Sequence, residues 1–126
     1  MRGSHGDDFY LESIWKAIKS LEGYSVVGRE LFLSDQMRQD AVICRLGVIG
    51  EAVKRLSDEF RSKYQEVPWK PMAALRDVLV HNYFGVDLEI IWGILERDLP
   101  SLKEQLAAIP ECKSIINENN SADEIK

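Results

Sequence analysis

Residues 41–60, AVICRLGVIGEAVKRLSDEF, carry the most regular hydrophobic pattern of the chain. Large apolar side chains recur there at steps of four and three residues, the spacing of one face of an α-helix: Val42, Leu46, Ile49, Val53, Leu56 and Phe60. Ser34 is a suitable N-cap for a helix that begins ahead of this stripe. Such a long apolar face must be covered by at least two other helices. The stretch therefore predicts the central helix of an all-α fold.

Two glycines, Gly47 and Gly50, lie inside this predicted helix. Each costs a helix interior about 1 kcal/mol relative to alanine. Because glycine has no side chain, we expect another helix to approach closely at these positions.

Helical spacing continues on both sides of the central stretch. We expect an amphipathic helix before it that ends at Gly23, then a connecting loop with a helical turn over residues 24–33. A third helix is expected to begin near Pro68, and Asp87 is a suitable N-cap for a fourth. The stretch Asp98-Leu99-Pro100 predicts a kink or a restart followed by a last helix, because proline lacks a backbone donor and fits only the first turn of a helix. The sequence thus predicts an all-α up-and-down bundle of four main helices plus a short fifth.

The two ends of the chain differ from this pattern. Residues 1–6, MRGSHG, resemble the start of an affinity tag, which leaves His81 as the one histidine of the remaining sequence. We expect the bundle to occupy residues 7–109. Residues 110–126 are polar and lack a sustained apolar stripe, so we expect a flexible C-terminal tail.

The composition excludes several protein classes. At 126 residues and 45% hydrophobic content, the chain fits one globular domain and is too apolar for a disordered one. No apolar run is long enough for a membrane span, and no secretory signal is visible. Cys44 and Cys112 are too few for a disulfide framework and match no metal-binding spacing, so we expect a cytoplasmic protein in a reducing environment.

The charge is unevenly distributed. A net charge of −5 argues against a general polyanion binder, because affinity for phosphate comes mainly from Lys and Arg. Residues 54–76, however, hold six basic and three acidic side chains, a local balance of +3: Lys54, Arg55, Arg61, Lys63, Lys70 and Arg76 against Asp58, Glu59 and Glu66. If this segment borders a cleft, its field can recruit RNA while the acidic remainder limits indiscriminate binding.

One stretch, residues 76–83 (RDVLVHNY), concentrates functional groups. Arg76 can grip a phosphate and stabilise a pentacoordinate phosphorane, and His81 can take a proton from a ribose 2′-OH or give one to the leaving 5′-oxygen. That chemistry needs neither a metal nor another cofactor. Asp77 can orient either group, and Asn82 and Tyr83 can donate hydrogen bonds.

The geometry of this stretch leaves alternatives open. Arg76 and His81 are five residues apart, about 140° around an ideal helix and about 7.5 Å along it. They can converge through the long arginine side chain, through unwinding near Gly85, or across a seam with a second protomer. They can equally be a surface ion-pair partner and a partner of the helix dipole. Glu51, at the edge of the central apolar face, fits either an orienting carboxylate for this pair or a solvated flank or interhelical ion pair.

The order Arg76-x4-His81-x-Tyr83, with the polar Asp77 after the arginine, resembles the signature of HEPN-superfamily ribonucleases, in particular the HepT-like toxins of HEPN/MNT toxin–antitoxin systems. The resemblance covers about residues 8–109. It extends to segments in the same order: Asp40-Ala41-Val42, Ile49-Gly50-Glu51-Ala52, Val67-Pro68-Trp69, the run 81–84 and Asp98-Leu99-Pro100.

The resemblance implies a dimerising bundle whose motif helices line a cleft at the dimer interface. It implies metal-independent endoribonuclease activity on RNA, with tRNA and mRNA as candidate targets and Arg76 and His81 as the catalytic pair. It also implies a nucleotidyltransferase antitoxin that silences the toxin by attaching AMP to Tyr83, in a homodimer or a larger assembly with the antitoxin. Bulky negative charge on that tyrosine would repel an incoming phosphate. The alternative is a non-catalytic HEPN-like dimer that binds a nucleotide or a partner.

Overall fold

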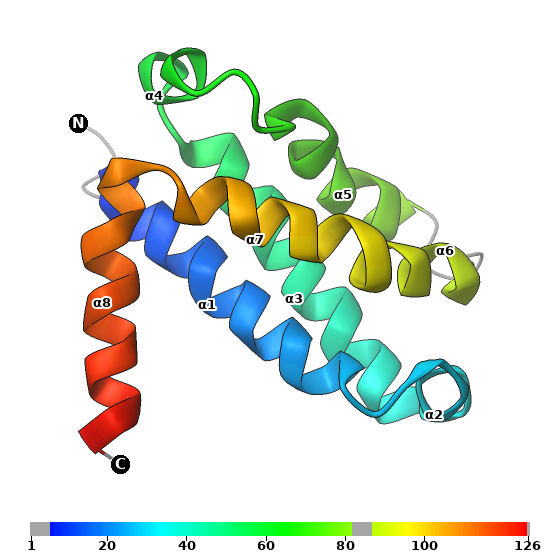
Figure 1. Cartoon of the computed structure of the whole chain (residues 1–126). Coiled ribbons are helices and arrows are strands. Elements are labelled where there is room, and N and C mark those ends of the chain that lie inside the picture. Colours follow the sequence, from blue (N-terminus) through cyan, green and yellow to red (C-terminus); the bar gives the residue numbers. More distant parts are fainter. Residues whose placement is uncertain (1–5, 82–86, 126) are drawn as a thin grey trace.

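The computed structural model describes residues 6–81 and 87–125, and this part of the chain is helical and contains no strand (Figure 1). The long helices are α1 (Asp7–Ser25), α3 (Gln36–Arg55) and α5 (Trp69–His81). A fourth long helical segment is formed by α6 (Leu88–Gly93), the π-helical turn η2 (Ile94–Asp98) and α7 (Leu99–Ala107). Two short helices, α2 (Arg29–Ser34) and α4 (Asp58–Lys63), connect the long ones, and α8 (Pro110–Ile125) follows. The predicted all-α class is confirmed.

Helix α3 is the centre of the bundle, because it packs against both α1 and α5. All six residues of the predicted stripe are buried: Val42, Leu46, Ile49, Val53, Leu56 and Phe60. The tryptophans belong to the same core, with Trp15, Trp69 and Trp92 at most 9% exposed. Covering the long apolar face of α3 on two sides is what fixes the positions of α1 and α5.

The helix carrying this stripe ends earlier than the pattern predicts. It stops at Arg55, and Leu56 has extended backbone angles. Ser57 then caps α4 by accepting a hydrogen bond from the Phe60 amide (3.1 Å). Asp7 of α1 accepts hydrogen bonds from the backbone amide and the hydroxyl of Ser57 (2.8 and 2.7 Å). This cap breaks the helix while Phe60 still reaches the core.

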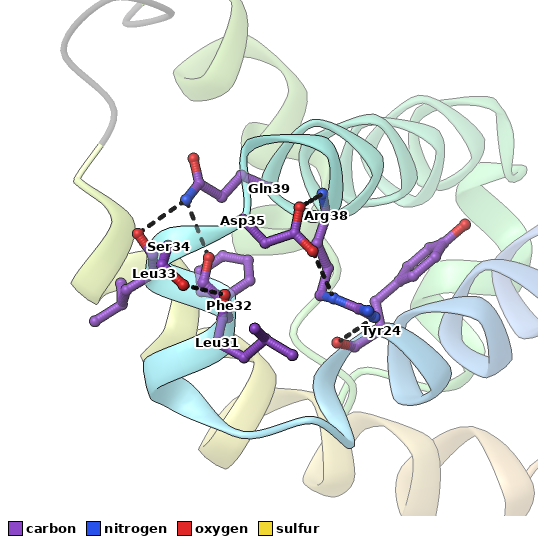
Figure 2. Close-up of polar contacts among 8 residues, drawn as sticks. All are labelled: Tyr24, Leu31, Phe32, Leu33, Ser34, Asp35, Arg38 and Gln39. Carbon is purple, nitrogen blue, oxygen red and sulfur yellow. Dashed lines mark hydrogen bonds and ion pairs between the residues drawn. The ribbon is translucent and has the colours of Figure 1, made fainter.

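The N-terminal end of α3 is fixed by polar contacts with α2 (Figure 2). Asp35, one residue after the predicted Ser34, is the N-cap and accepts a hydrogen bond from the Arg38 amide (3.2 Å). Gln39 is buried, and its amide donates to two backbone carbonyls at the end of α2 (3.0 and 3.1 Å). The predicted helical turn in residues 24–33 corresponds to the beginning of α2.

The predicted restart at Pro100 is confirmed, because α7 begins at Leu99 and has Pro100 in its first turn, where the missing donor is tolerated. The chain nevertheless stays helical from Leu88 to Ala107, because a π-helical turn joins α6 to α7. The predicted short last helix corresponds to α7. As predicted, Asp87 caps α6 and accepts a hydrogen bond from the Glu89 amide (2.9 Å).

Residues 110–125, expected to form a flexible tail, form helix α8 instead. Cys112 and Ile115 are buried, and α8 packs against α1 and α7. Figure 1 shows α8 beginning beside the N-terminal end of α1. Glu111 accepts hydrogen bonds from Lys63 Nζ (3.0 Å) and from the Tyr64 hydroxyl, which join α8 to α4 and the residue after it. The buried stripe is too sparse for sequence periodicity to reveal.

None of the helices described is both long enough and apolar enough to cross a lipid bilayer.

Candidate active site

Arg76 lies on α5 on the side that faces α3. Its Nε is 3.3 Å from Oε1 of Glu51, whose Oε2 accepts a hydrogen bond from Arg55 Nε (3.2 Å). The side chains of Arg76 and Glu51 are 47% and 40% exposed. An ion pair this exposed contributes at most about 1 kcal/mol to stability. Its main effect is to orient the guanidinium, and the interhelical ion pair that the sequence left open for Glu51 is confirmed.

Gly50 brings the backbones of α3 and α5 together directly beside Arg76. A Cβ atom on this glycine would lie 2.9 Å from the backbone nitrogen of Arg76 and 3.1 Å from the carbonyl oxygen of Met72. Real Cβ contacts are essentially never shorter than 3.0 Å, so no larger residue fits without displacing α5. The predicted close approach is confirmed at Gly50. At Gly47 a Cβ atom would meet no described atom within 4 Å, and the prediction is wrong there.

Asp77, the next residue, joins α5 to α3 a second time. Lys54 Nζ donates to Asp77 Oδ1 at 2.9 Å. The two pairs, Glu51–Arg76 and Lys54–Asp77, lie one helical turn apart on α3. Together with Gly50 they hold this part of α5 in a fixed orientation on α3.

A groove of about 500 Å³ lies beside Arg76, and we call it the Arg76 groove. It is mainly apolar, with the charged pair on its wall, and its lining residues are Ile43, Cys44, Gly47, Val48, Glu51, Arg76 and Leu79. Only Nε of the half-exposed guanidinium pairs with Glu51, so its terminal nitrogens are the atoms that could reach a phosphate in the groove.

His81 is the last residue of α5, and the helix is continuous from Arg76 to His81. The His81 side chain lies outside the described part of the structure, as do Asn82, Tyr83 and Gly85, near which unwinding of the helix was considered. The convergence of His81 with Arg76 and the roles of Asn82 and Tyr83 therefore stay predictions.

The comparisons with known proteins add to this geometry. Residues 14–109 match the family model described as "Ribonuclease HepT-like". The chain belongs to the HepT-like ribonuclease family. The family recognised from the Arg76-x4-His81-x-Tyr83 order is thus confirmed.

Several relatives of this HepT-like chain are 40% or more identical to it. A protein named "Probable ribonuclease HepT" from Thermococcus cleftensis is 44% identical over 104 residues, which cover 82% of this chain and 93% of that protein. A "Putative RNase" from Caldanaerobacter subterraneus is 42% identical over 101 residues, covering 79% and 90%. A protein from Methanocaldococcus jannaschii named "Gamma-glutamylcyclotransferase and putative RNase" is 45% identical over 103 residues. The match covers 81% of this chain and 46% of that relative, so the chain spans less than half its length. No solved structure matches the chain significantly.

The sequence alone did not reveal Lys54 as part of this HepT-like site. Lys54 and Asp77 are 23 residues apart, and no periodic signal links a surface lysine of one helix to a carboxylate of another. The charge balance of residues 54–76 was the only indication.

Other ionisable groups lie away from the Arg76 groove. Burial raises the pKa of the Cys112 thiol to about 11, so it stays protonated at neutral pH and is a poor nucleophile. Asp40, at the other end of α3, is exposed and accepts a hydrogen bond from Gln36 (3.1 Å). Among the side chains that the structure describes, which do not include His81 or residues 121–126, no three His, Cys, Asp or Glu groups come together as a metal site would require.

Proposed function

We propose that the chain is an endoribonuclease toxin that cleaves RNA without a metal ion through Arg76 and His81 at a dimer interface. The observation that carries the proposal is the position of Arg76: a half-exposed guanidinium on the wall of a groove, oriented by Glu51. Membership of the HepT-like ribonuclease family supports RNA as the substrate.

In the proposed reaction the ribose 2′-oxygen attacks the adjacent phosphorus while His81 takes the 2′-OH proton. Arg76 stabilises the extra negative charge of the phosphorane through its terminal nitrogens, since Nε is the atom that pairs with Glu51. The bond from phosphorus to the 5′-oxygen then breaks, and the protonated His81 gives its proton to that oxygen. The products are a 2′,3′-cyclic phosphate and a free 5′-OH. Asp77 and Glu51 are positioning residues here, and Asn82 supports phosphate binding.

The proposal includes regulation by a partner. A nucleotidyltransferase antitoxin attaches AMP to Tyr83, and the added phosphate repels the substrate phosphate from the site. Tyr83 lies two residues after His81 in the sequence, so a group attached to it would lie close to the end of α5. The toxin acts as a homodimer, which forms a larger assembly with the antitoxin.

The test is cleavage of RNA in excess EDTA by the wild type, His81→Ala and a control, Lys16→Ala. Lys16 is an exposed residue of α1, which does not line the Arg76 groove, and it pairs only with Glu12 among the described residues. We expect wild type and control to cleave equally with cyclic phosphate ends, and His81→Ala to lose at least about 100-fold in rate.

Two results would contradict the proposal. Abolition of cleavage by EDTA would refute the metal-independent route. Nucleotide binding without turnover of any RNA would favour the non-catalytic dimer instead.

A further inference from the structure

A second groove, of about 670 Å³, lies between α4 and the first half of α5, and we call it the α4–α5 groove. Its polar lining consists of Asp58, Arg61, Ser62, Gln65 and Lys70, and Pro68 and Trp69 provide an apolar surface. Four of these five polar side chains can donate hydrogen bonds, two of them carry positive charge, and the acidic one, Asp58, pairs with Arg61. A groove lined in this way is suited to an extended polyanion.

Lys70 is open to a ligand, and Arg61 is partly open, with a side chain that is 30% exposed and a buried Nε. Lys70 is exposed and pairs with no residue that the structure describes. Arg61 pairs with Asp58 at 2.5 Å, but the Asp58 side chain is 95% exposed. Water and salt screen such a contact, so a phosphate can displace this carboxylate at little cost.

The α4–α5 groove and the Arg76 groove share no lining residue, but both are bordered by α5. Lys70, Ala73 and Asp77 are spaced three and four residues apart, so they share one face of the helix. Ala73 lines the groove, and Asp77 is the residue held by Lys54 next to Arg76. Lys70 precedes Arg76 by six residues, about 9 Å along the helix axis. Figure 1 shows α4 at the end of the bundle where α5 begins, so the groove lies on the side of Arg76 away from His81.

We propose that the α4–α5 groove binds the sugar–phosphate backbone of the RNA substrate beside the scissile phosphate. This inference rests on the proposed function. A stacked strand rises about 3.4 Å per nucleotide, so the axial separation of about 9 Å between Arg76 and Lys70 corresponds to about three nucleotides, and the strand must also pass about 120° around α5. Trp69 is only 7% exposed, so the groove contacts sugars and phosphates and does not stack bases. It therefore recognises RNA with little preference for sequence.

The test is binding of a fluorescent single-stranded RNA whose 2′-O-methyl groups prevent cleavage, measured by anisotropy from low to high salt. For Lys70→Ala we expect the slope of log K against log salt to become shallower by about 0.7, the value for one lost phosphate contact on a single strand. If the wild type and Lys70→Ala bind equally at 1 M salt, this difference in slope makes Lys70→Ala bind RNA about fourfold more weakly than the wild type at 0.15 M salt. Lys70→Arg should restore binding, and Lys16→Ala, the charge-matched control, should bind as the wild type does.

Cleavage kinetics provide a second readout. A remote phosphate contact acts on substrate binding, so Lys70→Ala should raise KM about fourfold on cleavable RNA at 0.15 M salt and leave kcat within twofold. A merely structural role would lower the melting temperature instead and would not change the salt slope.

Three results would overturn the inference, and they are distinguishable. If RNA binds in an Arg76-dependent way but Lys70→Ala behaves like Lys16→Ala, the groove proposal fails and the proposed function stands. If the wild type neither binds nor cleaves RNA, both fail. If Lys70→Glu weakens self-association in sedimentation but not RNA binding, the groove is a contact with a second copy of the chain.

Discussion

The two glycines of α3 offer a direct test of how α3 and α5 pack around Arg76. Gly50→Ala places a Cβ atom 2.9 Å from the backbone nitrogen of Arg76, whereas Gly47→Ala places one where no described atom lies within 4 Å. Ordinary contacts begin at 3.4 Å, so α5 must move by about half an ångström to accept the first substitution. Overpacking of this kind costs about 1–3 kcal/mol.

Both substitutions also gain about 1 kcal/mol from the higher helix propensity of alanine. We therefore expect Gly47→Ala to be more stable than the wild type by up to about 1 kcal/mol, which raises the melting temperature by about 4 °C. For Gly50→Ala we expect a net loss of about 0–2 kcal/mol, so the two variants differ by about 1–3 kcal/mol.

The assay is urea unfolding of both variants at one protein concentration, followed by helical circular dichroism and by the fluorescence of the buried tryptophans. A lower midpoint for Gly50→Ala with an unchanged denaturant slope would support the close approach of the two backbones. If Gly50→Ala proved as stable as Gly47→Ala, the argument that Gly50 sets the position of Arg76 would be refuted.

Three further predictions follow from the described contacts. Glu51→Gln should lower kcat for RNA cleavage about tenfold, because Arg76 loses its orienting charge. The free energy of unfolding measured with urea should change by less than about 1 kcal/mol. An unchanged kcat would show that Glu51 has no role in the site. The pKa of Glu111 is lowered, first by the hydrogen bond that its carboxylate accepts from the Tyr64 hydroxyl. The carboxylate therefore stabilises the fold above about pH 4.3, and this contribution is lost as the pH falls through the folded-state pKa. Stability measured from pH 7 to 3 should therefore fall less steeply for Glu111→Gln than for the wild type, and parallel curves would contradict this contact. Cys44 is exposed and Cys112 is buried with a raised pKa, so a thiol reagent should label only Cys44 in the folded protein and both cysteines in urea; labelling of Cys112 without denaturant would show that α8 does not cover it.

The central helix was predictable because its apolar stripe is long and regular, and all of its members are buried. The ends of helices were less predictable, since they depend on contacts distant in sequence. The cap at Ser57 is completed by Asp7, 50 residues away, and no local pattern indicates it. The restart at Pro100 was predictable from the proline itself, whereas the π-helical turn that joins α6 to α7 has no sequence signature.

In the candidate site, too, local sequence features were predictable and contacts between helices were not. The sequence indicated Arg76 because functional side chains cluster in residues 76–83, and it predicted the close approach at Gly50 because glycine has no side chain. The sequence could not decide which role Glu51 has, because that depends on how α3 and α5 are rotated against each other. The pairing of Lys54 with Asp77 depends on the same rotation. Side-chain contacts between helices require the packed structure.

The most direct test of the central claim is the single-turnover rate of RNA cleavage by Arg76→Ala relative to Lys16→Ala, with both proteins shown to be folded by circular dichroism. The account predicts a loss of at least about 100-fold for Arg76→Ala, the usual effect of removing a group that stabilises charge in the transition state, and no change for Lys16→Ala. Equal rates for the two variants would contradict it.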